Sequence, residues 1–297
     1  MSSNPTESNV VNHNLDAWYE ANIERFQPPV CNCLMFRDQL KVMYVTGPNI
    51  RKDYHLELGE ELFFQVRGSM VVEAWERGRR KPVEIKEGEV FVLPARVPHS
   101  PQRFAGTLGL VVERERLPHE MDSLRYYVEG GGKDDLLFQA SFHCFDLGTQ
   151  LKPVIAAYFA SEEHRTGKPN PQRPVEPSPV PVDEEVTLHQ PFSLREAVEE
   201  RIEHMRSGGG FCYVFDEPEF KVRARISSLP EEAIPFDKMV WVLAGTCSLT
   251  SDGVVQQLKA KDHCLVRANV AHAISIDDPE CRLLEIWMEP RYLSNPE

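Results

Sequence analysis

Two histidines and one glutamate, placed against a glycine and a proline, are the residues of this chain best suited to bind a metal. His55 and Glu61 lie in the segment HLELGEELFFQVRGSM, and His99 lies near the end of the later segment GEVFVLPARVPHS. Gly68 follows the glutamate by seven residues, and Pro94 precedes the second histidine by five. Two imidazoles and one carboxylate on one side of an octahedral ion leave the opposite side open to substrate and dioxygen. The spacing therefore predicts an iron(II) site for oxygen chemistry.

A second glutamate and four other histidines show how specific this pattern is. Glu57 lies two residues after His55, so strand alternation turns both side chains to the same side, and Glu57 is a candidate fourth ligand. Any one of these residues could be an ordinary strand residue, but their joint placement against the turn residues favours a metal site. Four histidines have no partner at a useful spacing and are predicted not to bind metal: His119, His143, His164 and His189.

The segments that carry these residues have the composition of short strands. Between about residues 30 and 130, runs of β-branched and aromatic residues alternate with glycine and proline, which predicts an antiparallel barrel or sandwich. The sequence RGRRKP at 77–82 is typical of a polar hairpin tip. Helices are predicted at 14–26, with Asn14 as the N-cap, and at 146–160.

A proline-rich tract separates this part from the rest of the chain. Seven prolines fall between 169 and 191, a composition typical of an extended linker. After it, Ser193 precedes Glu196 by three residues, which is a capping box, and apolar residues at helical spacing predict one amphipathic helix over 193–206. Strands resume beyond this helix. The expected division of the chain is a catalytic domain at 1–165, a linker at 166–192 and a second domain at 193–297.

The second half of the chain repeats the pattern of the first. When the halves are aligned at Gly68 and Gly245, each predicted ligand faces one residue of the second half: His55 faces Glu232, Glu61 faces Lys238, and His99 faces His272. The second copy has thus lost two of the three ligands. An ammonium group in the carboxylate position would repel a cation, so we expect one metal ion per chain, bound in the first copy.

Composition excludes several classes of protein. With 297 residues, of which 41% are hydrophobic, the chain can fill two cores. A net charge of −13 and the lack of a basic cluster with interleaved aromatics argue against nucleic-acid binding. No apolar run reaches the roughly 18 residues of a membrane span, and the polar N-terminus predicts neither secretion nor membrane insertion. Seven cysteines without a CxxC pair fit a reducing compartment, so a cytoplasmic protein is expected.

Longer motifs resemble one family of iron enzymes. The stretches FQPPVCN, LKVMYVTGPNIRKDYHLELGEELFFQVRG and EIKEGEVFVLPARVPHSPQRFAGTLGLVVERER, together with DLGTQL and HRTGKP, resemble the 3-hydroxyanthranilate 3,4-dioxygenases. The resemblance covers about residues 26–170, and the remainder is similar to the degenerate second copy in the animal, single-chain form of this family. It implies a mainly β fold of two cupin barrels, which are double-stranded β-helix or jelly-roll barrels, with a few short helices.

The resemblance also implies an activity. Members of this family are non-haem iron(II), extradiol-type dioxygenases that convert 3-hydroxyanthranilate and O2 into 2-amino-3-carboxymuconate semialdehyde, in the kynurenine pathway of tryptophan catabolism and in quinolinate and NAD biosynthesis. The chain is therefore expected to be an enzyme with one Fe(2+), O2 as co-substrate and a small aromatic acid as substrate. Bacterial members carry a second iron on two C-x-x-C pairs, which this sequence lacks.

Motif by motif, the resemblance assigns roles to further residues. The family's iron ligands fall on the three residues predicted above, of which Glu61 also borders the substrate. Arg51 in NIRKDYH and Arg103 in PHSPQRF would hold the substrate carboxylate, and a guanidinium fork suits that group. Glu113 in VVERER would be the catalytic carboxylate beside the ring substituents, and Asn32 in PPVCN would lie on a loop that closes over the site.

Two other functions remain open at the level of sequence. Another iron or manganese cupin dioxygenase would keep the site and change the substrate, although the arginine pair favours an aromatic acid. A non-catalytic, metal-binding bicupin would need no carboxylate clamp, so oxygen-dependent turnover separates it from the enzymes. The second copy is expected to shield apolar surface that a lone barrel would bury by dimerising, which predicts a monomer.

Overall fold

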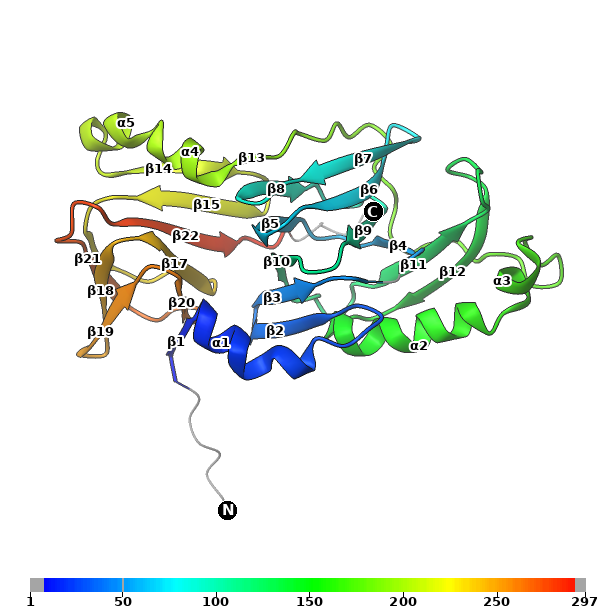
Figure 1. Ribbon diagram of the computed structural model, residues 1–297, viewed down its shortest axis with the longest axis horizontal. Coiled ribbons are helices and arrows are strands. Elements are labelled where there is room, and N and C mark those ends of the chain that lie inside the picture. The colour runs from blue at the N-terminus through cyan, green and yellow to red at the C-terminus, as the bar shows by residue number, and fades with distance from the viewer. Residues whose placement is uncertain (1–7, 50, 292–297) are drawn as a thin grey trace, which may run out of the picture. The chain divides into compact units, whose positions relative to one another are not determined.

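The computed structural model describes residues 8–49 and 51–291, which form two compact units. Residues 24–37 and 41–194 make up the first unit, and the described parts of 1–23, 38–40 and 195–297 make up the second. Both units consist mainly of strands, as predicted (Figure 1). No helix in the described residues is long and apolar enough to cross a membrane.

Two six-stranded sheets form the first unit. One sheet contains, in spatial order, β13 (Phe192–Ser193), β8 (Glu89–Leu93), β5 (Glu61–Arg67), β10 (Leu108–Arg114), β3 (Leu40–Thr46) and β2 (Asn32–Arg37). The other contains β12 (Leu136–Phe142), β11 (Asp122–Tyr127), β4 (Tyr54–Leu56), β9 (His99–Arg103), β6 (Met70–Glu76) and β7 (Arg79–Ile85). Neighbouring strands pair antiparallel, and the predicted hairpin tip at 77–82 lies where β6 turns into β7.

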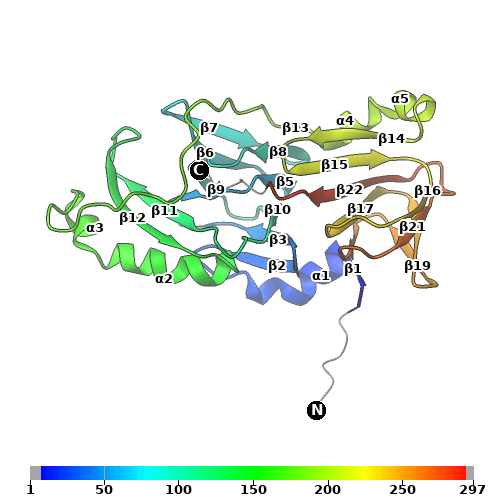
Figure 2. The same ribbon diagram turned by 180° about the vertical axis from the view of Figure 1, so that it is seen from behind.

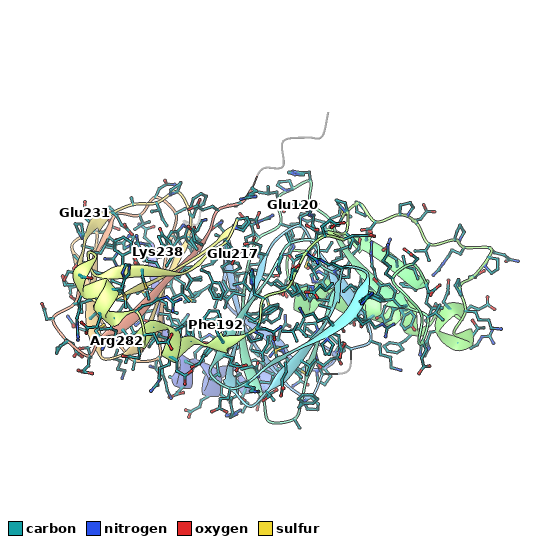
Figure 3. The ribbon with its side chains drawn as sticks, turned by 90° about the horizontal axis from the view of Figure 1, so that it is seen from above. Glu120, Phe192, Glu217, Glu231, Lys238 and Arg282 are labelled. Carbon is teal, nitrogen blue, oxygen red and sulfur yellow. The ribbon has the colours of Figure 1, made fainter. Side chains whose placement is uncertain are left out.

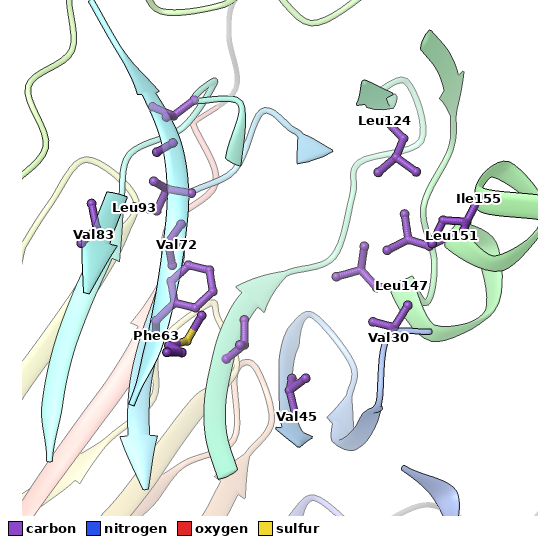
Figure 4. Close-up of a cluster of buried hydrophobic side chains, with 14 of the residues drawn as sticks. Val30, Val45, Phe63, Val72, Val83, Leu93, Leu124, Leu147, Leu151 and Ile155 are labelled. Atoms are coloured by element: carbon purple, nitrogen blue, oxygen red, sulfur yellow. The ribbon is translucent and has the colours of Figure 1, made fainter. Parts of the chain in front are cut away.

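Apolar side chains of the first unit gather in one core (Figure 4). Phe63, Val72 and Leu124 come from three different strands and are each at most 1% exposed. Helix α2 (Leu147–Phe159) adds Leu151, which is fully buried. Because successive side chains of a strand point to opposite faces, the same strands that supply this core also present polar side chains at fixed positions between the apolar ones.

The helices and the proline-rich tract of the first unit follow the strands. Asp146 caps α2 by accepting a hydrogen bond from the backbone N–H of Gly148 at 2.8 Å, and the predicted helix at 146–160 is confirmed. Helix α3 (Glu162–Thr166) comes next. Beyond it the tract has neither helix nor strand before β13, yet Val180 and Leu188 are only 1% and 3% exposed. The tract therefore packs as part of the first unit.

The second unit contains a six-stranded and a four-stranded sheet. The larger sheet has β1 (Val10–Asn14), β20 (Asp262–Val266), β17 (Lys238–Ala244), β22 (Arg282–Met288), β15 (Phe220–Arg225) and β14 (Phe211–Asp216). The smaller sheet has β16 (Leu229–Glu232), β21 (His272–Ser275), β18 (Thr246–Ser251) and β19 (Val254–Lys259); β16, β21 and β19 are labelled in Figure 2. Helix α1 (Leu15–Asn22), a 3-10 turn (Ile23–Arg25), α4 (Leu194–Glu199) and α5 (Ile202–Ser207) are the remaining helices of the described residues.

The N-terminal segment differs from its expected place. β1 pairs with β20, from Val10 opposite Val266 to Asn14 opposite Asp262, so it belongs to the second unit and not with the rest of residues 1–165. The physical reason is that β1 covers the edge of β20, whose backbone groups would otherwise be unpaired. Asn14 does precede α1, but its side-chain amide donates to Asp262 Oδ1 at 2.8 Å and makes no helix-capping bond.

The helix predicted over 193–206 is also different. It is interrupted between α4 and α5, and Ser193 is the last residue of strand β13, where it pairs with Glu89. The prediction of one continuous helix is therefore wrong. The predicted apolar stripe is nevertheless buried, with Ile202 at 7% and Met205 at 0% exposure, because the two short helices keep the same side toward the core.

Candidate metal centre

Three strands of the first unit bring the predicted ligands together. His55 is the middle residue of β4 and pairs directly with His99, the first residue of β9. Glu61 is the first residue of β5. Gly68 ends that strand with a φ of +68°, a left-handed conformation that glycine adopts without strain, and this turn leads the chain into β6. The glycine and the three ligands are thus parts of one strand arrangement.

The donor atoms of the three residues converge. One atom from each lies within 4.8 Å of the other two. His99 Nε2 is 3.0 Å and His55 Nδ1 is 3.7 Å from Glu61 Oε1, which is buried and has no hydrogen-bond partner. All three residues are at most 3% exposed. A buried carboxylate oxygen without a hydrogen bond, facing two imidazole nitrogens, fits a divalent transition-metal ion.

Each imidazole is oriented through its other nitrogen. His99 Nδ1 lies 3.0 Å from the carbonyl oxygen of Val97, which leaves Nε2 facing Glu61. His55 Nε2 lies 2.8 Å from Asp122 Oδ2, which leaves Nδ1 facing Glu61. Burial lowers the pKa of His55, but the hydrogen bond with Asp122 and the negative charges of Asp122 and Glu61 outweigh burial and raise the pKa to about 9. The surroundings of His55 therefore favour a positive charge at this point.

Further carboxylates surround the same point. One oxygen each from Glu57, Glu61 and Glu113 lie within 4.8 Å of one another. Glu57 Oε1 is also 3.8 Å from His55 Nδ1, so this glutamate turns to the side that strand alternation predicted. Burial raises the pKa of Glu113 and raises that of Glu57 well above its usual range, although the charge of Arg116 opposes both shifts. Such a concentration of carboxylates favours a bound cation.

A pocket opens on these donors. It encloses about 410 Å³ of space between the side chains, including its open mouth. Its apolar wall consists of Val30, Met43, Val45, Phe63, Val111 and Leu147. The three predicted ligands also line it, together with Asn32, Arg51 and Arg103. The pocket therefore presents apolar surface, cationic groups and metal donors to one small molecule.

The two arginines of the pocket differ in their partners. Arg51 Nε donates to Asp53 Oδ2 at 3.0 Å, so its charge is balanced within the protein. Arg103 is 4% exposed, and its Nη1 donates to the neutral Oε1 of Gln65 at 3.0 Å. No carboxylate in the described part of the chain forms an ion pair with Arg103. Burial and the charge of Arg51 lower the pKa of Arg103, so this site would be stabilised by an anion.

Comparison with known proteins identifies the family that shares these features. The family model described as 3-hydroxyanthranilic acid dioxygenase matches residues 7–159. The 3-hydroxyanthranilate 3,4-dioxygenase of Rattus norvegicus is 44% identical over 90% of this chain and 96% of the relative, and that of Homo sapiens is 45% identical over 86% and 89%. The chain belongs to the 3-hydroxyanthranilic acid dioxygenase family. The prediction of a ring-cleaving dioxygenase of this family is confirmed.

Solved structures share the fold of this dioxygenase-family chain. Salicylate 1,2-dioxygenase from Pseudaminobacter salicylatoxidans has a TM-score of 0.59 at 10% identity, covering 95% of this chain and 86% of that one. A cupin 2 conserved barrel domain protein from Leptotrichia buccalis has a TM-score of 0.52 at 13% identity, covering 94% and 96%. Likeness at such low identity concerns the fold alone, and it confirms the predicted mainly β cupin architecture.

Most residues that the family resemblance singled out meet at the pocket, but one does not line it. Glu113 lies on β10 beside Glu57 and Glu61, next to the donors and outside the pocket wall. In the described residues, the groups of His and Glu side chains that lie close enough together to hold a metal ion include none of the four histidines that were predicted not to bind metal: His119, His143, His164 and His189.

Arg116 and Asp122 are candidates that the sequence analysis missed. Arg116 Nε is 2.9 Å from Asp122 Oδ1, and its Nη2 is 2.6 Å from Glu57 Oε2 and 3.2 Å from Glu113 Oε2. Burial lowers the pKa of Arg116, but the three carboxylates outweigh burial and hold the pKa well above its usual value. Arg116 lies beyond the end of β10, where strand alternation gives no guidance, and Asp122 is 67 residues from His55. No local spacing could have linked them to the centre.

The second unit keeps the strand arrangement and changes the side chains. Glu232 of β16 pairs with His272 of β21, at the positions that correspond to the two histidine ligands. Lys238, which is labelled in Figure 3, is the first residue of β17, as Glu61 is of β5. Its Nζ contacts Glu232 and lies 3.1 Å from Glu285 Oε1. An ammonium group therefore takes part in ion pairs where the first unit has a carboxylate ligand.

Proposed function

We propose that this chain uses iron(II) and O2 to open the ring of 3-hydroxyanthranilate between carbons 3 and 4, giving 2-amino-3-carboxymuconate semialdehyde. The names of its relatives support this substrate. Within the structure, the proposal rests on Arg103, a buried cation without a carboxylate partner that lines the same pocket as the metal donors. An aromatic acid supplies the negative charge that Arg103 lacks while its ring fits the apolar wall.

Iron(II) is the metal that suits the proposed reaction. His55, Glu61 and His99 would hold the ion, and their donor set is the one that non-haem iron oxygenases use. When bound, iron supplies a Lewis acid with open positions at which the substrate and O2 meet. Glu57 is proposed to pair with Arg116, whose Nη2 lies 2.6 Å from Glu57 Oε2, and not to bind the ion.

The pocket wall would orient the substrate. Arg103, assisted by Arg51, would bind the substrate carboxylate through charge-assisted hydrogen bonds. Val111 and Phe63 would pack against the ring and exclude water. Because the cationic and apolar groups share one pocket with the donors, a substrate held at its carboxylate can direct its hydroxyl and amino groups toward the donors.

Glu113 is proposed as the residue that accepts the proton of the substrate hydroxyl. Its carboxylate lies within 4.8 Å of Glu61, so a group bound at the donors would lie near it. Burial raises its pKa, which makes it a stronger base than an exposed glutamate. Asn32, at the start of β2 and on the pocket wall, is proposed to contact the substrate when the neighbouring loop closes.

The oligomeric state and the cellular location of the protein are also part of the proposal. The second unit supplies its own two sheets and its own core, so no partner chain is needed to complete these sheets or this core. We infer a monomer in the cytoplasm, with one iron and no nucleic-acid or membrane partner. Light scattering of the purified protein at micromolar concentration checks the first point, and a dimer would contradict it.

The deciding experiment uses protein reconstituted with ferrous iron without air. On addition of 3-hydroxyanthranilate and O2, we expect one O2 consumed per substrate and the absorbance of the conjugated ring-opened product. Anthranilate, which lacks the hydroxyl group, is the matched control and should not be opened. Tight iron binding without oxygen uptake would contradict the proposed function and favour another aromatic acid or a non-catalytic bicupin.

A further inference from the structure

We propose that Arg116 is the positioning residue of the metal centre, and that it fixes both the orientation of His55 and the place of Glu113. The two effects come from one guanidinium that contacts three buried carboxylates. This inference deepens the proposed function, since it concerns how the protein prepares that site. Its main test, however, is metal binding, which needs no turnover.

The contacts of Arg116 use the whole guanidinium. Nε lies 2.9 Å from Asp122 Oδ1 and Nη2 lies 3.0 Å from Asp122 Oδ2, which makes a two-pronged fork on one carboxylate. Nη1 donates to the backbone carbonyl of Arg114 at 3.0 Å. The fork needs a planar group with several N–H donors, so a lysine ammonium cannot reproduce it.

The fork acts on His55 through Asp122. Asp122 Oδ2 accepts from Arg116 Nη2 and lies 2.8 Å from His55 Nε2, so the carboxylate cannot turn without losing one of these bonds. With Nε2 engaged, Nδ1 is the nitrogen left for the metal. His99 differs, because a backbone carbonyl orients it. His55 is thus the ligand whose orientation depends on a chain of side chains.

The same guanidinium acts on Glu113 from the other side. Its Nη2 is 3.2 Å from Glu113 Oε2 and 2.6 Å from Glu57 Oε2. All of these side chains are at most 2% exposed. Three buried carboxylates around one guanidinium favour a further cation nearby, and a divalent ion at the neighbouring donors would supply it. Arg116 therefore holds Glu113 beside the donors and keeps the carboxylates from being driven apart.

A nearby arginine provides a matched control. Arg114 is 1% exposed, like Arg116, and its Nη1 and Nη2 form a fork on Glu120 at 2.6 Å and 2.8 Å. Among the described residues, Glu120 belongs to none of the groups of side chains that lie close enough together to hold a metal ion. Replacing Arg114 by lysine breaks a buried fork of the same kind, on Glu120 instead of on the carboxylate that contacts His55.

The experiment measures the affinity of metal-stripped protein for Fe2+ without air, by competition with a chelating dye. We expect Arg116→Lys and Asp122→Asn each to weaken binding about 10–100-fold, the usual effect of losing a group that orients a ligand. The double variant should bind Fe2+ at most about twofold more weakly than the single variant with the lower affinity, because both changes break the same chain of contacts. Arg114→Lys should bind Fe2+ within about twofold of the parent protein.

Two further measurements separate positioning from a loss of folding. Circular dichroism and thermal melting of the metal-stripped proteins show whether each variant is folded, and Asp122→Asn, which keeps the side-chain size, serves if Arg116→Lys does not fold. At saturating iron, Arg116→Lys should lower kcat at least about tenfold while KM changes less than about threefold, since the carboxylate-binding arginines are intact.

Two results would overturn the inference. One is iron affinity within twofold of the parent in both Arg116→Lys and Asp122→Asn. The other is an equal loss in Arg114→Lys, which would show that any buried fork in this region has the same effect. If the parent binds iron, the two variants lose it and 3-hydroxyanthranilate is not turned over, the proposed function fails and the positioning role stands.

Discussion

The two units have the same strand arrangement at their centres and opposite ways of balancing charge. In the first unit, His55 pairs with His99 and Glu61 begins the adjoining strand. In the second unit the corresponding pair is Glu232 and His272, and the strand begins with Lys238. Both second histidines also have the same support, since Nδ1 lies 3.0 Å from a backbone carbonyl in each case. The backbone therefore does not decide which centre can hold a metal.

The side chains around each centre make the difference. In the second unit, Glu285 lies between three cations, with Oε2 at 2.7 Å from Arg223 Nε and 2.9 Å from Arg225 Nε, and Oε1 at 3.1 Å from Lys238 Nζ. Each of these charged side chains thus has a partner of opposite charge within the protein. The first unit instead leaves a carboxylate oxygen of Glu61 without a hydrogen bond. A barrel that balances its own charge is a structural core, and one that does not can bind an ion.

The largest difference should appear when the second histidine of each pair is removed. We expect His99→Ala to lose its iron and to lower turnover more than about a hundredfold, because a ligand matters more than the groups that orient it. His272→Ala should keep one iron per chain and its activity. Metal analysis after reconstitution checks both. Iron retained by the first variant, or lost from the second, would contradict the comparison.

The next difference concerns a buried arginine in each unit. Arg103→Met should raise KM about 10–100-fold, the cost of one charge-assisted hydrogen bond, while the iron content stays at one per chain. Arg225→Met removes a buried arginine from the second unit and should leave KM unchanged, although it lowers stability. Steady-state kinetics with metal analysis tests the pair. A loss of iron in Arg103→Met would show that the arginine supports the metal centre.

Acid should weaken the charge-balanced centre of the second unit. Burial raises the pKa of Glu285, but its three cationic partners outweigh burial and lower it to about 2, from an ordinary value of 4.5. The folded state then gains stability that is complete above pH 4.5 and is lost as the pH falls toward 2, about 3 kcal/mol in all. Urea unfolding followed by tryptophan fluorescence should show a shallower loss over this range in Glu285→Gln. An unchanged slope would mean that other carboxylates account for the acid sensitivity.

The smallest effect is expected when one residue of the first unit is replaced by the residue type at the corresponding position of the second unit. Arg96 has a φ of +64° three residues before His99, and Asn269 has a φ of +63° three residues before His272. Arg96→Asn loses a half-buried ion pair with Asp183 but gains a residue that tolerates this conformation. We expect the free energy of unfolding to change by less than about 1 kcal/mol. A larger loss in the urea midpoint would show that the pair with Asp183 is important for packing the proline-rich tract.

The sequence allowed the ligands to be predicted because each has a fixed place on a strand. The distance from Glu61 to Gly68 is the length of β5, and His99 begins a strand after a turn, so local chain geometry is readable as spacing. The alignment of Lys238 with Glu61 could be predicted for the same reason. The metal ligands and the degenerate copy thus follow from local rules.

The supporting residues could not be predicted because their contacts are set by tertiary structure. Asp122 reaches His55 only because β11 pairs with β4, with Leu124 opposite His55. Arg116 lies between two strands and follows neither strand period. The pairing of Ser193 with Glu89 and the pairing of β1 with β20 likewise depend on neighbours that are distant in the sequence. Spacing in the sequence indicates which side chains one strand carries, whereas the supporting residues are identified only by the pairing of strands in the structure.

The pairing of β1 with β20 has a consequence for how the chain is made. Val10–Asn14 leaves the ribosome long before its partner, Asp262–Val266, is synthesised. At about 5–20 residues per second, Val10–Asn14 must wait on the order of tens of seconds before that partner emerges. The second unit therefore cannot be completed while the chain is still short, and a fragment that begins after the proline-rich tract would expose the edge of β20 to aggregation.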